Sequence, residues 1–508
     1  MTPARAWIPG RDRLAVRHLP PTPRGSGPER PRVVVVGGGI AGLAAATGLA
    51  ERGIAVTLLE AEAELGGRVR AWPVDVADDP ATMSRGFHAF FRQYYNLRSL
   101  LRRADPGLER LVAIADYPLR LADGPQDSFA AIPRTPPWGV AAFVLASPSF
   151  RLRDLRHVDI DAALGLLDVD FPATLSAYDG VSAAEFLDRL NFPDTARHLA
   201  LEVFARSFFA DPREFSAGEL VAMFHSYFMG SAEGLLFDVP TDDYDTALWA
   251  PLGAYLRHLG VEIRTGTPAL AVAASASGMS VTVAGEELTA DGVVLATDLR
   301  TTRALVRRAE TLGTPGWREG IAVTQDAPPF GVLRLWLDRP VDADRLAFLG
   351  TSGFGPLDNV TVLERFEAGA ARWAAAHDGS VVELHAYAMT AEPDVVRAEL
   401  LTQLTRIYPE TAAAQTVAEQ WLVRDDCPLV GTEPWASRPE VSTPDPRLVL
   451  AGDGIRCDFP VALMERATTT GFLAANQLLA GWGRSGHELW TVPMSARIPA
   501  VRRLRRTA

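Results

Sequence analysis

Short hydrophobic runs near the start of the chain alternate with a helical pattern. Residues 33–36 are four consecutive valines, which is typical of a strand buried on both faces of a parallel sheet. A glycine-rich turn follows, then a helical stretch over 43–52 and a second apolar run over 55–60. The pattern predicts a βαβ unit over residues 32–60.

The same alternation returns further along the chain. It predicts helices at 255–258 and 461–479, strands at 261–263, 293–297 and 448–451, and a hairpin of 279–283 with 287–289. Two intervening stretches are richer in aromatic residues and have strands at 332–337 and 381–386. We therefore expect a discontinuous nucleotide-binding domain (32–118, 241–299 and 426–482) interrupted by a substrate domain (119–240 and 300–425). A disordered basic N-terminal extension (1–31) and a basic C-terminal tail (483–508) are expected to flank them.

The glycine-rich turn has the pattern Gly37-x-Gly39-x-x-Gly42, with Ile40 and Ala41 between the last two glycines. Its context, a strand before and a helix after, is the one that a dinucleotide-binding turn requires. Gly37 permits the tight turn, Gly39 lets the backbone approach a pyrophosphate, and Gly42 lets helix and strand pack closely. The pyrophosphate is expected at the positive end of the helix dipole. Glu60 ends the second strand, where an acid accepts the ribose hydroxyls and disfavours a 2′-phosphate.

Two further segments identify the dinucleotide as FAD. A second loop, Gly66-Gly67-Arg68, begins a few residues after Ala61 and is typical of flavin enzymes. Near the C-terminus, Gly452-Asp453 precedes a helix that is expected to begin near Pro460. Asp453 is predicted to bind a ribitol hydroxyl or a pyrophosphate-bound water. The helix start, with Pro460, Val461 and Met464, is predicted to face the flavin N1–C2=O edge, where negative charge develops on reduction.

Composition and charge exclude several classes of protein. The 508 residues carry a net charge of -12, which disfavours nucleic acid as a partner. All 50 basic residues are arginine, so mechanisms that need a lysine are excluded. Two cysteines, Cys427 and Cys457, are too few for a disulfide framework or a zinc site, so no metal is predicted and a reducing cytoplasm is expected.

Targeting features are few. The N-terminus lacks the apolar core of a secretory signal, and the longest apolar runs, such as 138–146, are far shorter than the ~20 residues needed to span a bilayer. The apolar stretch 138–150 is followed by an arginine-rich segment, 151–156, a pattern typical of helices that lie on a membrane surface. We expect a cytoplasmic protein in peripheral contact with the inner face of the plasma membrane; a core helix next to solvated arginines is the alternative.

Several segments resemble known enzymes. Residues 84–97 resemble the Gly-x-His-x-Phe block of plant-type carotene desaturases. Residues 460–467 and 470–476, with 358–360 and 380–385, are similar to actinobacterial β-carotene desaturase/methyltransferases, the isorenieratene synthases. The resemblance covers about residues 32–482 and implies an α/β fold. A glutathione-reductase-type, Rossmann-like FAD-binding domain would be interrupted by an α+β substrate domain, as in amine oxidases and phytoene desaturases.

The resemblance also implies a reaction. These enzymes convert a β-ionone ring of β-carotene to a trimethylated aromatic ring by hydride transfer to FAD, a methyl shift, proton loss and a second oxidation, without an external methyl donor. The substrate is a hydrophobic polyene, which needs an apolar tunnel, and a quinone or O2 is the expected electron acceptor. Eight aromatic residues are candidates for the tunnel wall: Phe87, Phe90, Phe204, Phe208, Phe209, Phe224, Tyr227 and Phe228.

Four residues are candidates for catalysis. The Gly86-Phe87 step is expected beside the isoalloxazine, so His88 is placed to remove a proton, with a packed histidine as the alternative. Arg92 is expected to contact the flavin or its phosphates. Glu383 and His385 lie two positions apart on a strand and therefore share a face, as an acid/base pair or a satisfied polar pair.

A further pair of charged residues, Glu465 and Arg466, is interpreted as an ion pair at the FAD-domain interface. Three alternative functions remain open at this point. One is an amine oxidase or protoporphyrinogen-type oxidase, although amine oxidases commonly place a lysine near flavin N5 and this chain has none. Another is a different polyene desaturase or isomerase. The third is a non-catalytic prenyl-lipid carrier, which the intact FAD motifs disfavour.

Overall fold

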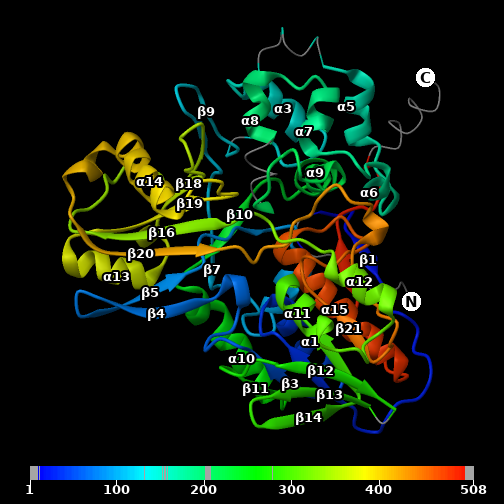
Figure 1. The fold of residues 1–508 in the computed structure, drawn as a ribbon. Helices are drawn as coiled ribbons and strands as arrows, with labels where there is room; N and C mark the ends of the chain where they lie inside the picture. Colours follow the sequence, from blue (N-terminus) through cyan, green and yellow to red (C-terminus); the bar gives the residue numbers. More distant parts are fainter. Residues whose placement is uncertain are drawn as a thin grey trace, which may run out of the picture.

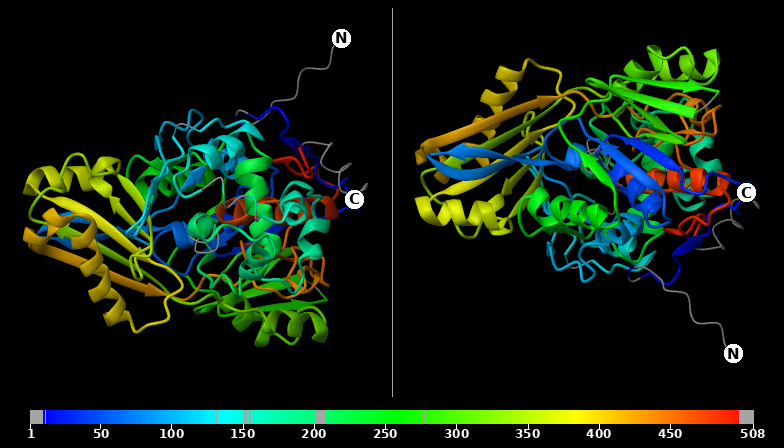
Figure 2. Two further views of the ribbon diagram at one scale, coloured as in Figure 1. Left: turned by 90° about the horizontal axis from the view of Figure 1, so that it is seen from above. Right: turned by 90° about the horizontal axis from the view of Figure 1, so that it is seen from below.

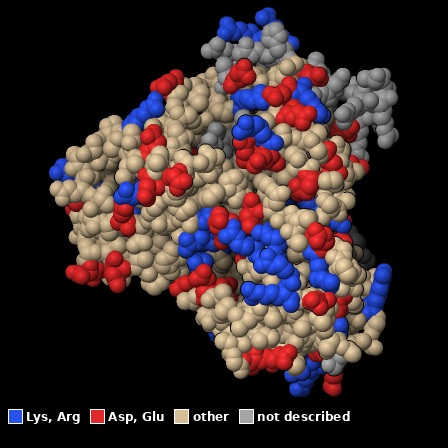
Figure 3. All heavy atoms as spheres, in the orientation of Figure 1, with Lys and Arg blue, Asp and Glu red and all other residues tan. Residues whose placement is uncertain are grey.

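A computed structural model shows a chain folded around two unlike sheets, with a group of helices beside them (Figure 1). The structure describes residues 10, 12–130, 132–150, 153, 156, 158–200, 208–276 and 278–497. Two further views place the larger sheet at one end of the molecule and the parallel sheet toward the other (Figure 2). On the face shown in Figure 3, acidic and basic side chains are interspersed, with basic groups concentrated near its centre.

The first sheet has five parallel strands in the order β11-β3-β2-β15-β21. Its strands are β11 (Glu262–Arg264), β3 (Ala55–Leu59), β2 (Arg32–Val36), β15 (Gly292–Leu295) and β21 (Leu448–Leu450). Helix α1 (Ile40–Ala50) leads from β2 to β3, and every residue of α1 is buried. The predicted βαβ unit is therefore confirmed.

Helix α15 (Leu463–Gly481) packs directly along α1. Small residues make this approach possible, because a Cβ added at Gly471 would lie 2.3 Å from the carbonyl oxygen of Ala41. At Gly48, an added Cβ would lie 2.9 Å from that of Ala475. The close packing fixes the start of α15 relative to the turn between β2 and α1, the two elements predicted to meet at the cofactor.

The second sheet has seven strands in the order β20-β16-β19-β18-β17-β8-β9. Its strands are β20 (Thr416–Arg424), β16 (Phe330–Leu337), β19 (Ser380–Ala386), β18 (Asn359–Val362), β17 (Phe348–Ser352), β8 (Leu119–Leu121) and β9 (Gln126–Asp127). Neighbours are antiparallel except β17 and β8. Helix α14 (Pro393–Ile407) packs on one face through Val396, Leu400 and Leu404.

Smaller elements complete the fold. The helices at the top of Figure 1 are α3 (Trp138–Ala146), α5 (Ile160–Leu167), α6 (Ala173–Ala177), α7 (Ala183–Arg189), α8 (Asp194–Ala200) and α9 (Ala217–Phe224). The others are α2 (Tyr95–Leu101), α10 (Ala250–His258), α11 (Leu299–Arg307), α12 (Pro315–Ala322) and α13 (Ala368–His377). The hairpins and short sheets comprise β4 (Ala71–Val76) with β5 (Asp79–Ser84), β6 (Phe90–Phe91) and β7 (Leu111–Ala113) on either side of β10 (Phe237–Pro240), and β12 (Ala271–Ser275), β13 (Gly278–Val283) and β14 (Glu286–Ala290). No helix of the described part is long and apolar enough to cross a membrane.

The N-terminal extension differs from the sequence prediction where the structure describes it. Strand β1 (Val16–His18) pairs antiparallel with β22 (Leu489–Thr491), so this part is ordered rather than disordered. The cause is local burial, because Ala15 of this segment packs against the apolar cluster of Tyr95, Trp490 and Val492. Asp12 is fully buried and accepts a hydrogen bond from Arg497 (2.6 Å). The division of the rest of the chain into domains stays a prediction.

Candidate active site

A cavity of about 500 Å³ lies between the parallel sheet and the seven-stranded sheet. Twelve of the residues predicted to bind FAD line one part of it: Gly37, Gly39, Ile40, Ala41, Glu60, Ala61, Gly66, Gly67, Arg68, Gly452, Asp453 and Met464. The predicted Phe87 and His88 also reach the wall. The cavity therefore brings together segments that lie more than 400 positions apart in the sequence.

The glycine turn has the geometry that its sequence predicts. Gly37 has a φ of +109°, and an added Cβ would lie 2.5 Å from the carbonyl oxygen of Ala296. A Cβ at Gly42 would lie only 1.8 Å from the carbonyl oxygen of Gly37. Gly39 is the N-cap of α1 and forms no side-chain cap hydrogen bond, so the first N–H groups of the helix are available to a ligand. This end of α1 fits an anionic pyrophosphate.

Glu60 is fixed at the edge of the cavity by two backbone groups. The N–H of Gly38 donates to its Oε2 (2.6 Å), and the N–H of Glu62 donates to its Oε1 (2.9 Å). Burial raises the pKa of Glu60, and these two hydrogen bonds oppose the rise. A carboxylate held in this way presents its remaining lone pairs to hydroxyl donors, as recognition of a ribose requires.

The second glycine loop meets the last strand of the parallel sheet. Gly66 has a φ of +106°, and the indole of Trp249 occupies the space that a Cβ would take. The loop then directs Arg68 to an ion pair with Asp453, just beyond β21. Asp453 is therefore placed by both β21 and Arg68, at the point where a flavin ribityl chain is expected.

The start of α15 reaches the cavity through Met464. Leu463, the first residue of this helix, has a φ of +51°, a strained conformation for a residue with a side chain. Pro460 and Val461, which were also predicted to contact the cofactor, line a separate cavity of about 20 Å³ instead. Gly42 and Gly86 are not in the wall of the larger cavity either; an added Cβ would meet the carbonyl oxygen of Gly37 at Gly42 and the imidazole of His385 at Gly86.

Aromatic side chains form much of the rest of the cavity wall. Of the eight residues predicted to do so, Phe87, Phe208, Phe209 and Tyr227 line it. Phe90, Phe224 and Phe228 do not: Phe90 and Phe228 pack in the main apolar core, and Phe224 packs against Phe228. Phe204 lies outside the described residues. The wall also contains six aromatic residues that were not predicted from sequence: Phe91, Tyr94, Tyr117, Phe330, Phe348 and Tyr387.

His88 contacts the backbone rather than another acidic or basic side chain. Its Nδ1 lies 2.8 Å from the carbonyl oxygen of Gly86, and its own N–H donates to the hydroxyl of Tyr244 (2.9 Å). Burial lowers the pKa of His88 to about 4. The ring is therefore neutral near pH 7, with Nδ1 as the donor and Nε2 as a weakly basic acceptor.

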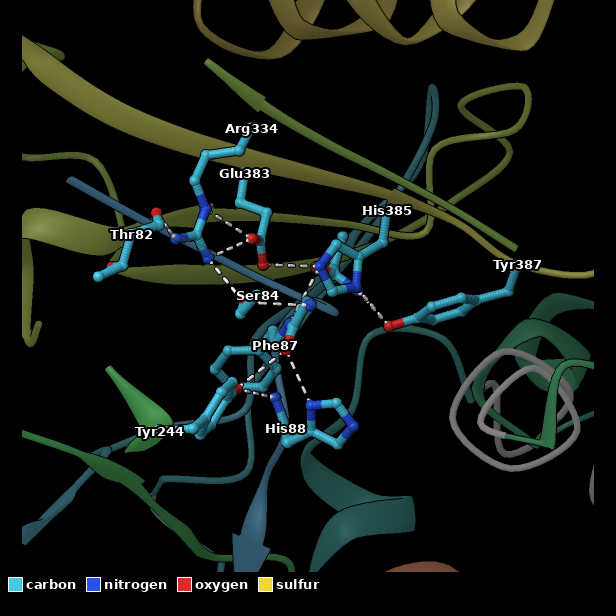
Figure 4. Close-up of polar contacts among 11 residues, drawn as sticks. Thr82, Ser84, Phe87, His88, Tyr244, Arg334, Glu383, His385 and Tyr387 are labelled. Atoms are coloured by element: carbon cyan, nitrogen blue, oxygen red, sulfur yellow. Dashed lines mark hydrogen bonds and ion pairs between the residues drawn. The ribbon is translucent and has the colours of Figure 1, made fainter. Parts of the chain in front are cut away.

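Glu383 and His385 lie together, as their spacing predicts. Nε2 of His385 lies 2.8 Å from Oε1 of Glu383, and Arg334 contacts Oε2 through Nη2 (2.6 Å) and Nε (3.0 Å) (Figure 4). His385 reaches the cavity, while Glu383 is buried behind it. Burial opposes ionisation of Glu383, but the charge of Arg334 and the hydrogen bonds from His385 and Arg334 lower its pKa to about 2.

Tyr387, which was not among the residues predicted from sequence, extends this group to the cavity. Its hydroxyl lies 2.7 Å from Nδ1 of His385, and Nδ2 of Asn359 donates to the same hydroxyl (3.1 Å). The alternation Glu383-x-His385-x-Tyr387 is the sequence signal that identifies it, because residues two apart share a face.

Two other predictions were wrong. Arg92 does not line the cavity; it pairs with Asp238 (3.3 Å), which also binds Arg98 (2.6 Å). Glu465 and Arg466 do not pair with each other. Arg466 pairs with Glu219 (2.5 Å), whereas Glu465 accepts the N–H groups of Asn96 (2.8 Å) and Leu97 (2.9 Å) at the start of α2. Adjacent residues of a helix point in different directions, which is why each finds its own partner.

Comparison with known proteins places this site in a family. The profile of the flavin-containing amine oxidoreductases matches residues 40–479. The chain belongs to that family. The match runs from the first residue of α1 almost to the end of α15, so it includes the segments that line the cavity except Val36, Gly37 and Gly39 at the end of β2 and in the turn. The chain is an FAD-dependent oxidoreductase, and the predicted family, fold class and cofactor are confirmed.

Two relatives match nearly the whole oxidoreductase. The carotenoid phi-ring synthase of Streptomyces griseus is 54% identical over 502 residues, which cover 97% of each chain. The carotenoid phi-ring synthase of Chlorobaculum tepidum is 26% identical, with 91% of each chain covered. A solved putrescine oxidase double mutant has a TM-score of 0.64 at 16% identity, covering 89% of this chain and 99% of its own. That last likeness shows the fold alone.

Proposed function

We propose that this oxidoreductase acts on a carotenoid and converts β-ionone rings of β-carotene to aromatic rings, with a methyl shift within each ring. The observation that carries the proposal is the 54% identity, over 97% of both chains, to a carotenoid phi-ring synthase. The absence of lysine separates the chain from the lysine-dependent chemistry of amine oxidases on this fold.

The cavity suits a hydrophobic ring. Phe87 stacks on Phe348 with ring centroids 4.4 Å apart, and Phe237 packs against both rings edge-on. Aromatic faces carry negative partial charge, so they stabilise a cation that develops beside them in a site without bulk water. This wall therefore favours a reaction that passes through a carbocation.

The residues around the turn between β2 and α1 would hold FAD, with Glu60 on the ribose and Asp453 near the ribityl chain. When bound, FAD supplies the two-electron oxidation as a hydride acceptor. The chain itself would orient the ring, exclude water and remove the protons that the reaction releases. Glu383 and His385 would act as the acid/base pair, and neutral His88 would form part of the wall. A quinone or O2 would accept the electrons.

A polyene substrate is dissolved in lipid, so we also propose that α3 contacts the cytoplasmic face of the plasma membrane. Trp138 and Leu145 lie two helical turns apart on α3 and are 69% and 72% exposed. Arg153 and Arg156 follow in the chain, where anionic lipid headgroups would attract them. Flotation with anionic liposomes is expected for the natural chain and reduced for the variant Trp138→Ser/Leu145→Ser. Equal flotation of the two would rule out α3 as the contact.

The test of the proposed activity is pigment analysis of β-carotene-producing bacteria that express this chain. Each converted ring loses four hydrogens, so we expect a product lighter by that amount per ring, with the absorption spectrum of an aromatic carotenoid. Tyr408→Phe is the control for expression, because Tyr408 lies at the end of α14, in the apolar cluster between that helix and the seven-stranded sheet. Unchanged β-carotene beside folded, FAD-loaded protein would overturn the proposal and favour another polyene or a porphyrinogen.

A further inference from the structure

We propose that Tyr387 takes the proton from the reacting ring and passes its own hydroxyl proton to His385, which Glu383 and Arg334 support from behind. The inference rests on the proposed aromatisation, because it names the base for a proton loss in that reaction. A tyrosine hydroxyl at the cavity begins a continuous series of hydrogen bonds that leads into the sheet (Figure 4).

The series follows from the register of two strands. Arg334 on β16 lies directly opposite Glu383 on β19, and His385 follows on the same face. Tyr387 comes immediately after the end of β19 and continues the alternation toward the cavity. The exposure of the side chains follows the same order. Arg334 and Glu383 are buried to 2% and 0% exposure, and Tyr387 is only partly buried.

Glu383 and Arg334 decide the direction of each hydrogen bond. The carboxylate of Glu383 is ionised, because Arg334 holds its pKa at about 2, and an ionised carboxylate can only accept. Two groups meet Nε2 of His385: Oε1 of Glu383 (2.8 Å), which can only accept, and the backbone N–H of Phe87 (3.1 Å). We assign the ring proton to Nε2, toward the shorter and charged partner. Nδ1 is then the acceptor for the hydroxyl of Tyr387.

Asn359 leaves one acceptor position on the tyrosine oxygen. Nδ2 of Asn359 donates to that oxygen (3.1 Å), while the hydroxyl proton points to His385. A hydroxyl has two acceptor lone pairs, so one remains for a proton from the ring. The turn at Gly86 lies directly against the imidazole of His385. A Cβ added at Gly86 would be only 2.6 Å from Cε1 of that ring, so the backbone here limits how the ring can move.

The proposed step conserves protons and electrons. After the methyl group has moved, the ring cation carries a hydrogen on the carbon that received it. In a ring that an earlier two-electron oxidation has already made a diene, the oxygen of Tyr387 takes this proton, and the electron pair of the broken C–H bond completes the aromatic ring. The hydroxyl proton moves to Nδ1 of His385, and the ionised Glu383 stabilises the resulting imidazolium. No oxidant takes part in this step.

His88 is the competing base in the cavity, and its surroundings favour it less. Burial lowers its pKa to about 4, and its Nδ1 contacts only a backbone carbonyl. No carboxylate hydrogen-bonds to His88 among the described residues, whereas His385 has Glu383 at 2.8 Å. A proton delivered to His385 therefore gains a counter-charge that a proton on His88 lacks.

The experiment compares Tyr387→Phe, His385→Asn and their double variant in β-carotene-producing bacteria and as purified FAD-loaded proteins. Each single variant is expected to lower aromatic product about 100-fold or more, the usual contribution of a general base. The double variant is expected to lose no more than either single, because the two residues act as one unit. Flavin content and the anaerobic bleaching of flavin by β-carotene are expected to stay at the natural level, since hydride removal precedes the proton loss.

The matched control is Tyr408→Phe, which removes a partly buried tyrosine hydroxyl that donates to the carbonyl of Leu346 and lies outside the cavity. Aromatic product at the natural level in Tyr387→Phe would overturn the inference and leave the proposed function standing. If Tyr387→Phe loses flavin bleaching as well as the aromatic product, the inference is also overturned, because Tyr387 would then be needed for the structure of the site rather than for the proton loss. If the natural chain leaves β-carotene unchanged, the proposed function and this inference both fall.

Discussion

The Arg334–Glu383 ion pair allows a prediction of magnitude. Arg334→Met removes the arginine and leaves a carboxylate in a position with 0% exposure. The pKa of Glu383 is about 2, against an ordinary value of 4.5, and each pKa unit is worth about 1.4 kcal/mol. Loss of the arginine is therefore expected to lower the free energy of unfolding at pH 7 by about 3 kcal/mol or more. This agrees with the 3–5 kcal/mol typical of a broken buried pair.

The sign of the pH dependence follows from the lowered pKa. The pair stabilises the fold above pH 4.5, and this contribution is lost as the pH falls toward 2. Urea unfolding, followed by flavin release and circular dichroism at pH 7, measures the change. The double variant Arg334→Met/Glu383→Leu is expected to be more stable than Arg334→Met, because no charge is left buried. A single variant within about 1 kcal/mol of the natural protein would refute the reasoning.

Three further predictions test separate parts of the molecule. Gly42→Ala is expected to yield protein without bound FAD, measured as the flavin-to-protein ratio, because the added Cβ would lie 1.8 Å from the carbonyl oxygen of Gly37; a normal ratio would contradict it. Glu465→Gln is expected to make the free energy of unfolding, measured by urea titration, depend less on pH between about pH 4.5 and 8. Burial raises the pKa of Glu465 to about 8, so the natural protein loses stability as the pH rises through that window, and an unchanged slope would contradict this account. Gly86→Ala is expected to lower aromatic product as strongly as Tyr387→Phe does, because φ is +97° and the Cβ would displace His385; product at the natural level would show that the turn tolerates a side chain.

The FAD site could be predicted from sequence because most of its parts are local. Gly37, Gly42 and Glu60 lie within one βαβ unit, and few other residue types could permit the tight turn, allow the close packing or bind the ribose at these positions. The distant contributors, Arg68 and Asp453, were recognisable because each follows its own glycine. Backbone constraints of this kind leave a pattern in the sequence whatever the rest of the fold does.

Side-chain partners across the sheet could not be predicted in the same way. Arg334 meets Glu383 only because β16 and β19 pair in one register, which a single sequence does not specify. Arg92 was wrongly placed at the flavin for the same reason, since its partner Asp238 lies 146 positions away on β10. Tyr387 continues the alternation of Glu383 and His385 in the sequence. Its proposed role, however, depends on a cavity that forms only when distant segments pack together.

The two faces of β16 and β19 explain why a charged pair is retained inside this sheet. Leu333 and Leu384 point to the face that packs under α14, where apolar contacts stabilise the domain. Arg334 and Glu383 occupy the alternate positions, on the face that leads to Tyr387 and the cavity. Apolar residues of similar volume are often as stable as a buried ion pair, so stability alone does not require charge here. In the proposed aromatisation, the proton that reaches His385 is stabilised by the charge of Glu383, and this is the reason that we assign to the pair.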